Sequence, residues 1–121
     1  GLAFYDRAIR VLAEAREAFW AVIRDNIETR ADIAAWWQVL AEGAEPGADP
    51  EDAAFVAEAL AILPEPPYGP EAWAEWTAAV KAQSGRKGKA LFMPLRKALT
   101  GRARGPEMAD FMPLMRARPK P

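Results

Sequence analysis

The chain of 121 residues has 16 Lys or Arg against 17 Asp or Glu, a net charge of −1, and 51% of its residues are apolar, which is too many for a disordered protein. It contains no cysteine and no histidine, which excludes disulfide frameworks, thiolate zinc sites, cysteine nucleophiles and the commonest general base. This length suits one domain, or two small subdomains that share a core.

The first predicted element is an amphipathic helix over residues 4–23. Its apolar residues recur at helical spacing and form one stripe, made of Phe4, Ala8, Val11, Leu12, Ala15, Phe19, Val22 and Ile23. On the polar side, Asp6–Arg10 and Arg10–Glu14 are spaced for ion pairs one turn apart.

A second helix is predicted to begin after Thr29. Thr29 and Asp32 resemble a capping box, with Asp in place of the usual Glu. The apolar face of this helix would consist of Ile33, Trp36, Trp37 and Leu40. Gly43 is expected to end it.

Three later helices are predicted from one kind of start, which recurs as Asp49-Pro50-Glu51, Gly69-Pro70-Glu71 and Gly105-Pro106-Glu107. Asp or Gly suits the N-cap, and proline loses nothing at the first helical position because the N–H there has no partner. Glu faces the positive end of the helix dipole. The first of these helices would run to Leu63. The second would place Trp73, Trp76, Thr77 and Val80 on one face.

Pro94 predicts one more helix start, because a proline inside a helix removes a backbone hydrogen bond. Counting 100° per residue puts Leu95, Ala98 and Leu99 on one face. The opposite face would carry Arg96, Lys97 and Thr100. Gly101 would end this helix, which therefore presents Arg96 outward from its first turn.

Together these elements predict an all-α fold, a compact helical cage or bundle of about six helices. The proline-rich joint at residues 64–70 is the expected boundary between an N-terminal subdomain, 1–66, and a basic C-terminal subdomain, 67–121. No apolar run approaches the ~20 residues of a membrane span, and no signal peptide is recognisable. We therefore expect a cytoplasmic protein without a membrane partner.

Positive charge is concentrated at the end of the chain. Residues 1–80 hold 5 Arg and 15 acidic residues, a net charge of −10, and residues 81–121 hold 11 Lys or Arg and 2 acidic residues, a net charge of +9. Seven cations lie within 19 residues: Arg86, Lys87, Lys89, Arg96, Lys97, Arg102 and Arg104. This split favours an anionic partner, nucleic acid above all. Two alternatives stay open: the two halves attract each other, or the cations only solvate the surface.

No catalytic or metal site is predicted. The carboxylates lie mostly on solvated faces of amphipathic helices, and Gly85-Arg86-Lys87-Gly88-Lys89 has neither the spacing nor the preceding strand of a phosphate-binding loop. Four tryptophans could stack on bases, but their place on apolar faces favours core packing. They are Trp36, Trp37, Trp73 and Trp76. Core packing is also favoured for Met108, Phe111, Met112 and Met115.

The stretch GRKGKALFMPLRKALTG at residues 85–101, followed by Gly105-Pro106-Glu107, closely resembles the C-terminal anticodon-binding region of bacterial glutamyl-tRNA synthetases. Trp73 and Trp76, with Val80 and Lys81, resemble the same family, and residues 19–26 do so more loosely. The strong resemblance covers residues 72–115.

The resemblance implies an all-α cage that grips the anticodon of the tRNA for glutamate, with glutamine tRNA as a second candidate. A class I catalytic domain, attached or separate, would hold ATP and Mg²⁺. No cofactor is expected here, since this chain lacks the His-Ile-Gly-His and Lys-Met-Ser-Lys signatures. By this resemblance, the residues expected to contact the anticodon bases are Arg96, Gly105, Pro106 and Met108. Contacts to the tRNA backbone are expected from Arg86, Lys87, Lys89, Lys97, Arg102 and Arg104. We expect a monomer that does not bind DNA.

Two positions depart from the family pattern. Asn26 aligns with a family arginine that reads another anticodon base, so discrimination between glutamate and glutamine anticodons stays open. Arg116 stands where the family has Gly, and the prolines that follow predict no further helix. The rival hypothesis is a stand-alone helical module for protein or RNA interaction, whose basic half docks on an acidic partner.

Overall fold

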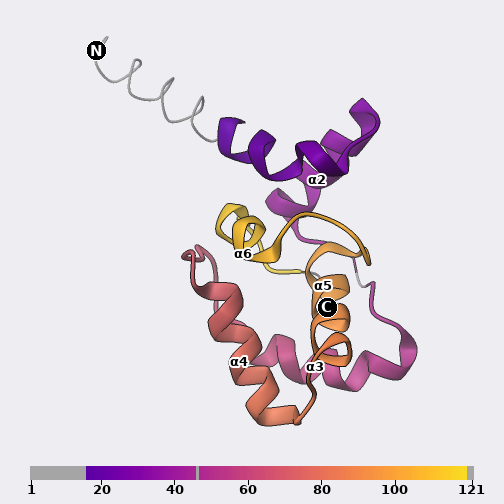
Figure 1. Cartoon of the computed structure of the whole chain (residues 1–121), viewed down its shortest axis with the longest axis vertical. Coiled ribbons are helices and arrows are strands. Elements are labelled where there is room, and N and C mark those ends of the chain that lie inside the picture. The colour runs from indigo at the N-terminus through magenta and orange to yellow at the C-terminus, as the bar shows by residue number, and fades with distance from the viewer. Residues whose placement is uncertain (1–15, 46, 120–121) are drawn as a thin grey trace.

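The computed structural model describes residues 16–45 and 47–119, which form helices joined by short loops, with no strand among them (Figure 1). Residues 16–23 are helical. The α-helices that follow are α2 (Arg30–Glu42), α3 (Ala53–Ala61), α4 (Ala72–Ser84), α5 (Lys89–Thr100) and α6 (Met108–Phe111). Short 3-10 helices are η1 (Arg24–Asn26), η2 (Pro50–Asp52) and η3 (Met112–Leu114). The predicted all-α class is confirmed.

Part of the first predicted helix lies outside the described residues. This part contains both expected ion pairs, Asp6–Arg10 and Arg10–Glu14, and the beginning of the apolar stripe, Phe4, Ala8, Val11, Leu12 and Ala15. Of the rest of the stripe, Ile23 is fully buried, and Phe19 and Val22 pack against the core.

One hydrophobic core joins the described helices. α5 packs against α3 and α4, and α4 also packs against α6 and η3 (Figure 1). The core takes side chains from both sides of the proline-rich joint, including Trp36, Leu40, Val56, Ala59, Trp76, Val80, Leu95, Leu99, Phe111 and Met112. This agrees with subdomains that share a core, while the boundary between residues 66 and 67 stays a prediction.

The capping box that begins α2 is confirmed. The Asp32 N–H donates to Thr29 Oγ1 at 3.4 Å, and the Thr29 N–H donates back to Asp32 Oδ2 at 3.1 Å. The Glu28 N–H donates to the same carboxylate oxygen at 2.8 Å. At the other end Gly43 caps the helix with φ +90°, and a side chain there would collide with the carbonyl oxygen of Arg118. Glycine is therefore required at this position by both conformation and space.

Asp32 should make the stability of the protein depend on pH. Hydrogen bonds from the Glu28 and Thr29 N–H groups lower the pKa of Asp32 below its ordinary value of 3.8. A lowered pKa in the folded state adds stability that is present above 3.8 and is lost as the pH falls below it. We expect Asp32→Asn to be less stable at pH 7 and to show a flatter loss of thermal stability on acidification, measured by circular dichroism. Asp25→Asn changes an exposed carboxylate outside the cap, and an equal flattening in that control would contradict the assignment.

Each of the three helices predicted from a Pro-Glu start begins within two residues of its proline. Asp49 is the N-cap of η2, with Pro50 at its first position, and η2 leads directly into α3. α3 ends at Ala61 and not at Leu63. α4 and α6 begin two residues after their prolines, at Ala72 and Met108, because Pro70 lies in a turn and Glu107, with ψ 125°, is not helical.

The prediction that a helix begins at Pro94 is wrong, because α5 begins at Lys89 and contains Pro94. Proline has no N–H, so the carbonyl oxygen of Ala90, four residues earlier, loses its helical donor. Arg86 supplies another, since its Nη1 donates to Ala90 O at 3.2 Å. A donor from outside the helix thus lets α5 continue through the proline.

The predicted buried face of α5 is confirmed, since Leu95, Ala98 and Leu99 are buried and Gly101 caps the helix. Thr100 was expected on the exposed face and is buried instead. Its hydroxyl donates to Arg96 O at 2.9 Å and accepts from the Arg102 N–H at 3.1 Å, which draws it inward.

The C-terminal tail forms no helix after η3 in the described residues, as its prolines predict. It crosses two other elements. The Arg116 N–H donates to Leu40 O of α2 at 2.7 Å, and Arg118 pairs with Glu65 at 3.2 Å and donates to Leu60 O of α3. The tail therefore fastens the end of α2 to the end of α3.

Candidate nucleic-acid interface

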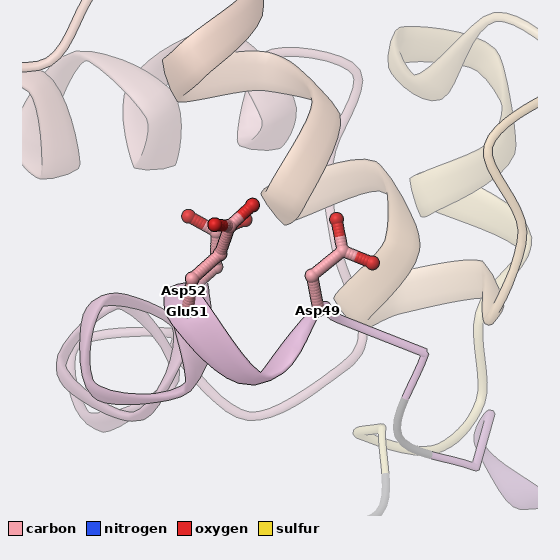
Figure 2. A group of neighbouring side chains, drawn as sticks. All are labelled: Asp49, Glu51 and Asp52. Atoms are coloured by element: carbon pink, nitrogen blue, oxygen red, sulfur yellow. The ribbon is translucent and has the colours of Figure 1, made fainter.

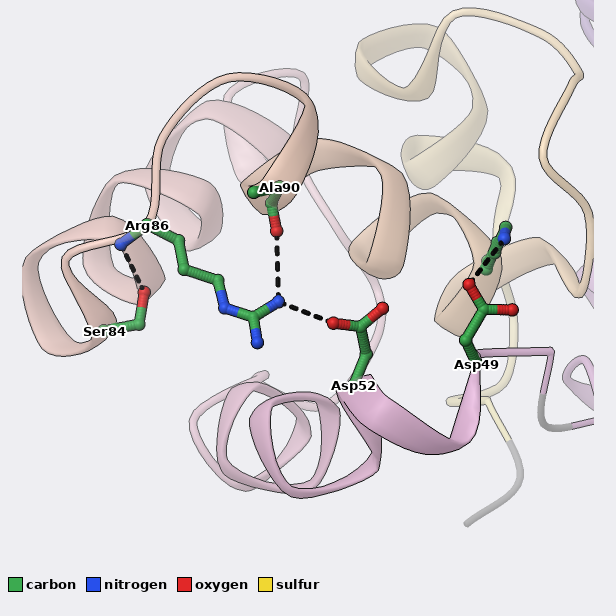
Figure 3. Close-up of polar contacts among 6 residues, drawn as sticks. Asp49, Asp52, Ser84, Arg86 and Ala90 are labelled. Atoms are coloured by element: carbon green, nitrogen blue, oxygen red, sulfur yellow. Dashed lines mark hydrogen bonds and ion pairs between the residues drawn. The ribbon is translucent and has the colours of Figure 1, made fainter.

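Two of the seven clustered cations pair with acids of the N-terminal half. Arg86 Nη1 lies 2.8 Å from Asp52 Oδ1, and Lys97 Nζ lies 3.3 Å from Asp49 Oδ2 (Figure 3). The attraction between the acidic and basic halves, left open from composition, therefore exists in the folded chain. It does not account for the other cations of the cluster.

The acidic partners belong to a group of three carboxylates at the start of α3. Asp49, Glu51 and Asp52 bring their oxygens within 4.8 Å of one another (Figure 2). Oxygen ligands of this kind suit a hard cation. Two of the three are already paired with Arg86 and Lys97, so we assign no metal to this group.

Four cations of the cluster remain available to an anionic ligand. Lys87, Lys89, Arg102 and Arg104 are exposed, and none forms an ion pair with the part of the chain that the structure describes. The guanidinium carbon of Arg102 lies 4.7 Å from the ring centroid of Trp36, a cation–π contact.

Arg96 is held beside the segment that follows α5. Its Nη1 donates to Pro106 O at 2.8 Å, which uses one of the five N–H donors of a guanidinium. Gly105 permits the close packing of Trp36, because a Cβ there would lie 2.6 Å from Trp36 Cη2, while Arg96 Nη1 would be in ordinary contact at 3.5 Å. Three of the four residues expected to read bases therefore meet at one place.

A pocket of about 330 Å³ contains Arg96 in its wall. It is also lined by Trp73, Lys89, Phe92, Met93, Glu107 and Met108. Phe92 is 44% exposed, and its ring centroid lies 6.2 Å from that of Trp73. Aromatic rings beside a guanidinium and a lysine are the groups on which proteins stack and orient unpaired bases.

A second hollow, of about 670 Å³, lies against the same segment. Gly105, Pro106 and Glu107 line it together with Asn26 and Asp25 of η1. Glu107 borders both hollows. The structure thus brings Asn26, far away in the sequence, to the residues expected to read bases.

The expected base readers differ in what they expose. Arg96 and Gly105 are half-buried, whereas Pro106 is buried and Met108 is 1% exposed. Met108 can offer a ligand only a small apolar surface in the pocket. α6 is 4 residues long and begins at Met108, after Gly105, Pro106 and Glu107.

The tryptophans divide between core and surface. Trp36 and Trp76 are buried, as predicted, and the Trp76 indole donates to Ala59 O at 2.9 Å. Trp37 is 41% exposed, so core packing is wrong for it. Phe19 contacts its ring in a T-shaped pair, and the guanidinium carbon of Arg116 lies over the ring, 5.0 Å from the centroid. Met108, Phe111, Met112 and Met115 are all buried.

Sequence reasoning missed the aromatic wall of the smaller pocket. Trp73 was assigned to the core and is half-buried in that wall, and Phe92 was not considered as a ligand contact. The sequence did offer a signal for Phe92. This aromatic residue lies in the basic stretch between Glu75 and Glu107, which contains no carboxylate.

In the described part of the chain, the helices are too short or too polar to cross a bilayer.

Comparison with known proteins gives consistent matches. The model of a family described as "Anticodon binding domain" matches residues 3–116, which leaves out most of the divergent tail. "Glutamate–tRNA ligase 1" of Cereibacter sphaeroides is 62% identical over 109 residues, which cover 90% of this chain and 25% of that protein. "Glutamate–tRNA ligase 2" of Dinoroseobacter shibae is 62% identical over 112 residues, 93% of this chain and 26% of that protein.

A further relative, "Glutamate–tRNA ligase 1" of Roseobacter denitrificans, is 59% identical over 97 residues, 80% of this chain and 22% of that protein. The chain spans about a quarter of the length of the curated relatives it matches. No solved structure gives a significant match.

Proposed function

Because the chain belongs to the anticodon-binding domain family, we propose that it binds the anticodon loop of the tRNA for glutamate and serves a glutamate–tRNA ligase. Its relatives carry that name, and it aligns with about a quarter of their length. The chemistry of charging is assigned to a class I catalytic domain, attached or separate, which would hold ATP and Mg²⁺. This domain supplies recognition and needs no cofactor of its own.

One observation carries the proposal: the pocket that combines Arg96 with Phe92 and Trp73. Anticodon bases are unpaired, so a protein can splay them onto aromatic side chains and bond to their edges. Arginine suits this task because its planar fork can bond two acceptors on one base. A domain that bound only phosphates would not need exposed aromatic rings beside its cations.

The proposed roles follow from exposure and existing partners. Arg96 reads a base edge, and half-buried Gly105 lies beside that base. Pro106 and Met108 are buried, so they support the site from below and offer a base little surface of their own. The free cations Lys87, Lys89, Arg102 and Arg104 bind the tRNA backbone. Lys97 joins them only by leaving Asp49, an exchange that an exposed pair permits at little cost. Arg86 is already bonded on two sides, and we assign it a different role.

The setting of this activity is also part of the proposal. Its partners are tRNA and the catalytic domain of the ligase, in the cytoplasm, where bacterial tRNAs are charged. We propose that the domain acts as a monomer and has neither DNA nor a membrane as a partner. Sedimentation at micromolar concentration, with and without tRNA, tests the oligomeric state.

A binding assay across salt concentrations tests the function. We expect the 121-residue chain to bind a glutamate tRNA transcript of Cereibacter sphaeroides better than an unrelated tRNA. The logarithm of affinity should fall linearly with the logarithm of salt concentration, with a slope of about −3 if four cations each contact one phosphate. Binding of a glutamine tRNA transcript in the same assay tests whether the domain discriminates between glutamate and glutamine anticodons, the question that Asn26 leaves open.

The rival hypothesis predicts a different result. A module that docks on an acidic protein would show no preference among tRNAs whatever their anticodon. Equal affinity for the glutamate tRNA and for an unrelated tRNA at every salt concentration would therefore contradict anticodon recognition. A glutamate transcript with its three anticodon bases exchanged is the matched control, because it keeps the phosphate backbone unchanged.

A further inference from the structure

We propose that Arg86 is a positioning residue for the pocket: it ties the first turns of α5 to the start of α3 and does not itself contact tRNA. This inference rests on the proposed function, because the pocket is the one assigned to an anticodon base. It replaces the expectation, drawn from charge alone, that Arg86 binds the tRNA backbone.

The need for such a residue comes from Pro94. α5 continues through this proline although the Ala90 carbonyl has lost its donor within the helix. Missing hydrogen bonds of this kind are where helices bend. The gap also separates the residues of the pocket. Lys89, Phe92 and Met93 precede Pro94, and Arg96 follows it. The angle between the two parts of α5 therefore sets the distance from the aromatic wall to the guanidinium of Arg96.

Arg86 fills this gap from outside the helix. Its Nη1 donates to Ala90 O at 3.2 Å and to Asp52 Oδ1 at 2.8 Å (Figure 3). Its guanidinium carbon also lies 4.0 Å from the ring centroid of Phe55 in α3. One side chain thus connects α5 with both η2 and α3.

The main chain at Arg86 is anchored as well. Its N–H donates to Ser84 Oγ at 3.2 Å (Figure 3). This hydroxyl in turn donates to Val80 O inside α4 at 2.8 Å. The Arg86 side chain is 31% exposed and the Asp52 side chain 18% exposed, so their pair is more shielded from water than a surface salt bridge. Both N–H groups of Nη1 are taken, by Asp52 and by Ala90, so only the remaining N–H groups of Arg86 could meet a phosphate.

Replacing Asp52 separates the two roles, because they predict opposite signs. If Arg86 positions the pocket, Asp52→Ala weakens binding of the glutamate tRNA transcript, by about tenfold for the loss of a charged hydrogen bond that orders the wall. If Arg86 binds phosphate, the same change releases its guanidinium and removes a negative charge, so binding becomes tighter. Asp52 makes no cap hydrogen bond to α3, so alanine there does not uncap the helix.

Glu51→Ala is the matched control. Glu51 is exposed, is adjacent in sequence, and carries the same charge as Asp52. We expect this variant to bind the transcript as well as the wild type, or slightly better. Weakened binding in both variants to the same extent would overturn the proposal, and so would tighter binding in Asp52→Ala alone.

The salt dependence gives a second readout that a phosphate contact would change. Arg86→Lys should weaken binding with the slope of the wild type, because the lysine nitrogen ends one bond short of the Nη1 that bonds Asp52 and Ala90. Lysine also lacks the planar guanidinium that lies over Phe55. Lys87→Ala, by contrast, should make the slope less negative by about 0.7 for one lost contact to a single strand. An unchanged affinity in Arg86→Lys, or an Asp52→Ala chain without helical circular dichroism at 25 °C, would overturn a local positioning role.

Hydrogen exchange of the free protein keeps this test separate from the proposed function. The amides of Leu91, Phe92 and Met93 should exchange faster in Asp52→Ala than in Glu51→Ala, with no tRNA present. Equal exchange in the two variants would overturn the positioning role. If the wild type binds no tRNA, the proposed function fails, and the exchange result still decides whether Arg86 holds α5.

Discussion

Leu95→Ala is expected to lower the free energy of unfolding by about 2–5 kcal/mol. Leu95 has 0% exposure and lies on the buried face of α5 with Ala98 and Leu99. Because α5 packs against both α3 and α4, the cavity left by the lost methyl groups would be enclosed on more than one side. A domain of this size is stabilised by only about 5–15 kcal/mol in total, so this substitution removes a large share. Urea unfolding followed by circular dichroism measures it.

Phe92→Ala is the matched control on the same helix. It removes a larger side chain, but Phe92 is 44% exposed, and changes at exposed positions usually cost much less than changes in a core. Phe92→Ala should therefore unfold near the wild-type urea midpoint and bind the glutamate tRNA transcript more weakly. Equal losses of stability in the two variants would mean that α5 does not bury Leu95 in preference to Phe92.

Local signals predicted most of the helical elements. The capping box of Thr29 and Asp32, the stop at Gly43 and the buried face of Trp76, Thr77 and Val80 all follow from residues within a few positions of one another. Such signals need no knowledge of the rest of the chain.

The start of α5 could not be predicted in this way. Pro94 ends a helix when only neighbouring residues are considered. In the folded chain Arg86 reaches Ala90 O while it is held by Asp52, which lies 34 residues away in sequence. A contact over that distance compensates for a local preference, and no pattern within α5 records it. Thr100 shows the same effect on a smaller scale, because the loop after α5 folds back onto its hydroxyl.

The candidate site was predicted in outline from its charge. The cluster of cations was evident, and the resemblance directed attention to Arg96 and Gly105. Which cations are free was not evident, because Arg86 and Lys97 pair with acids 34 and 48 residues away. The meeting of Phe92 with Trp73 also depends on how α4 and α5 pack, which periodicity does not specify.

Arg96→Ala is expected to weaken binding of the glutamate tRNA by about 1–3 kcal/mol. Arg96 lies in the pocket beside Phe92 and Trp73, and one of its N–H groups already bonds to Pro106 O. That bond fixes the guanidinium before tRNA arrives, so little side-chain freedom remains to be lost on binding. The loss of the same bond should lower the free energy of unfolding by only about 1 kcal/mol. Titration with the glutamate transcript and with its anticodon-exchanged control measures the effect.

The anticodon dependence distinguishes Arg96 from the cations around it. Arg104 is exposed and forms no ion pair within the described residues. Arg104→Ala should therefore weaken binding of both transcripts alike and make the salt slope less negative by about 0.7. Arg96→Ala should weaken binding of the glutamate transcript most, so that its affinity comes close to that of the anticodon-exchanged control. Arg96→Lys keeps the charge and loses the planar fork, so it should behave like Arg96→Ala if a base edge is read and like the wild type if only charge matters. If Arg96→Ala still discriminated fully between the glutamate transcript and its control, the base would be read elsewhere. The second hollow, with Asn26, would then be the leading candidate for the base-reading site.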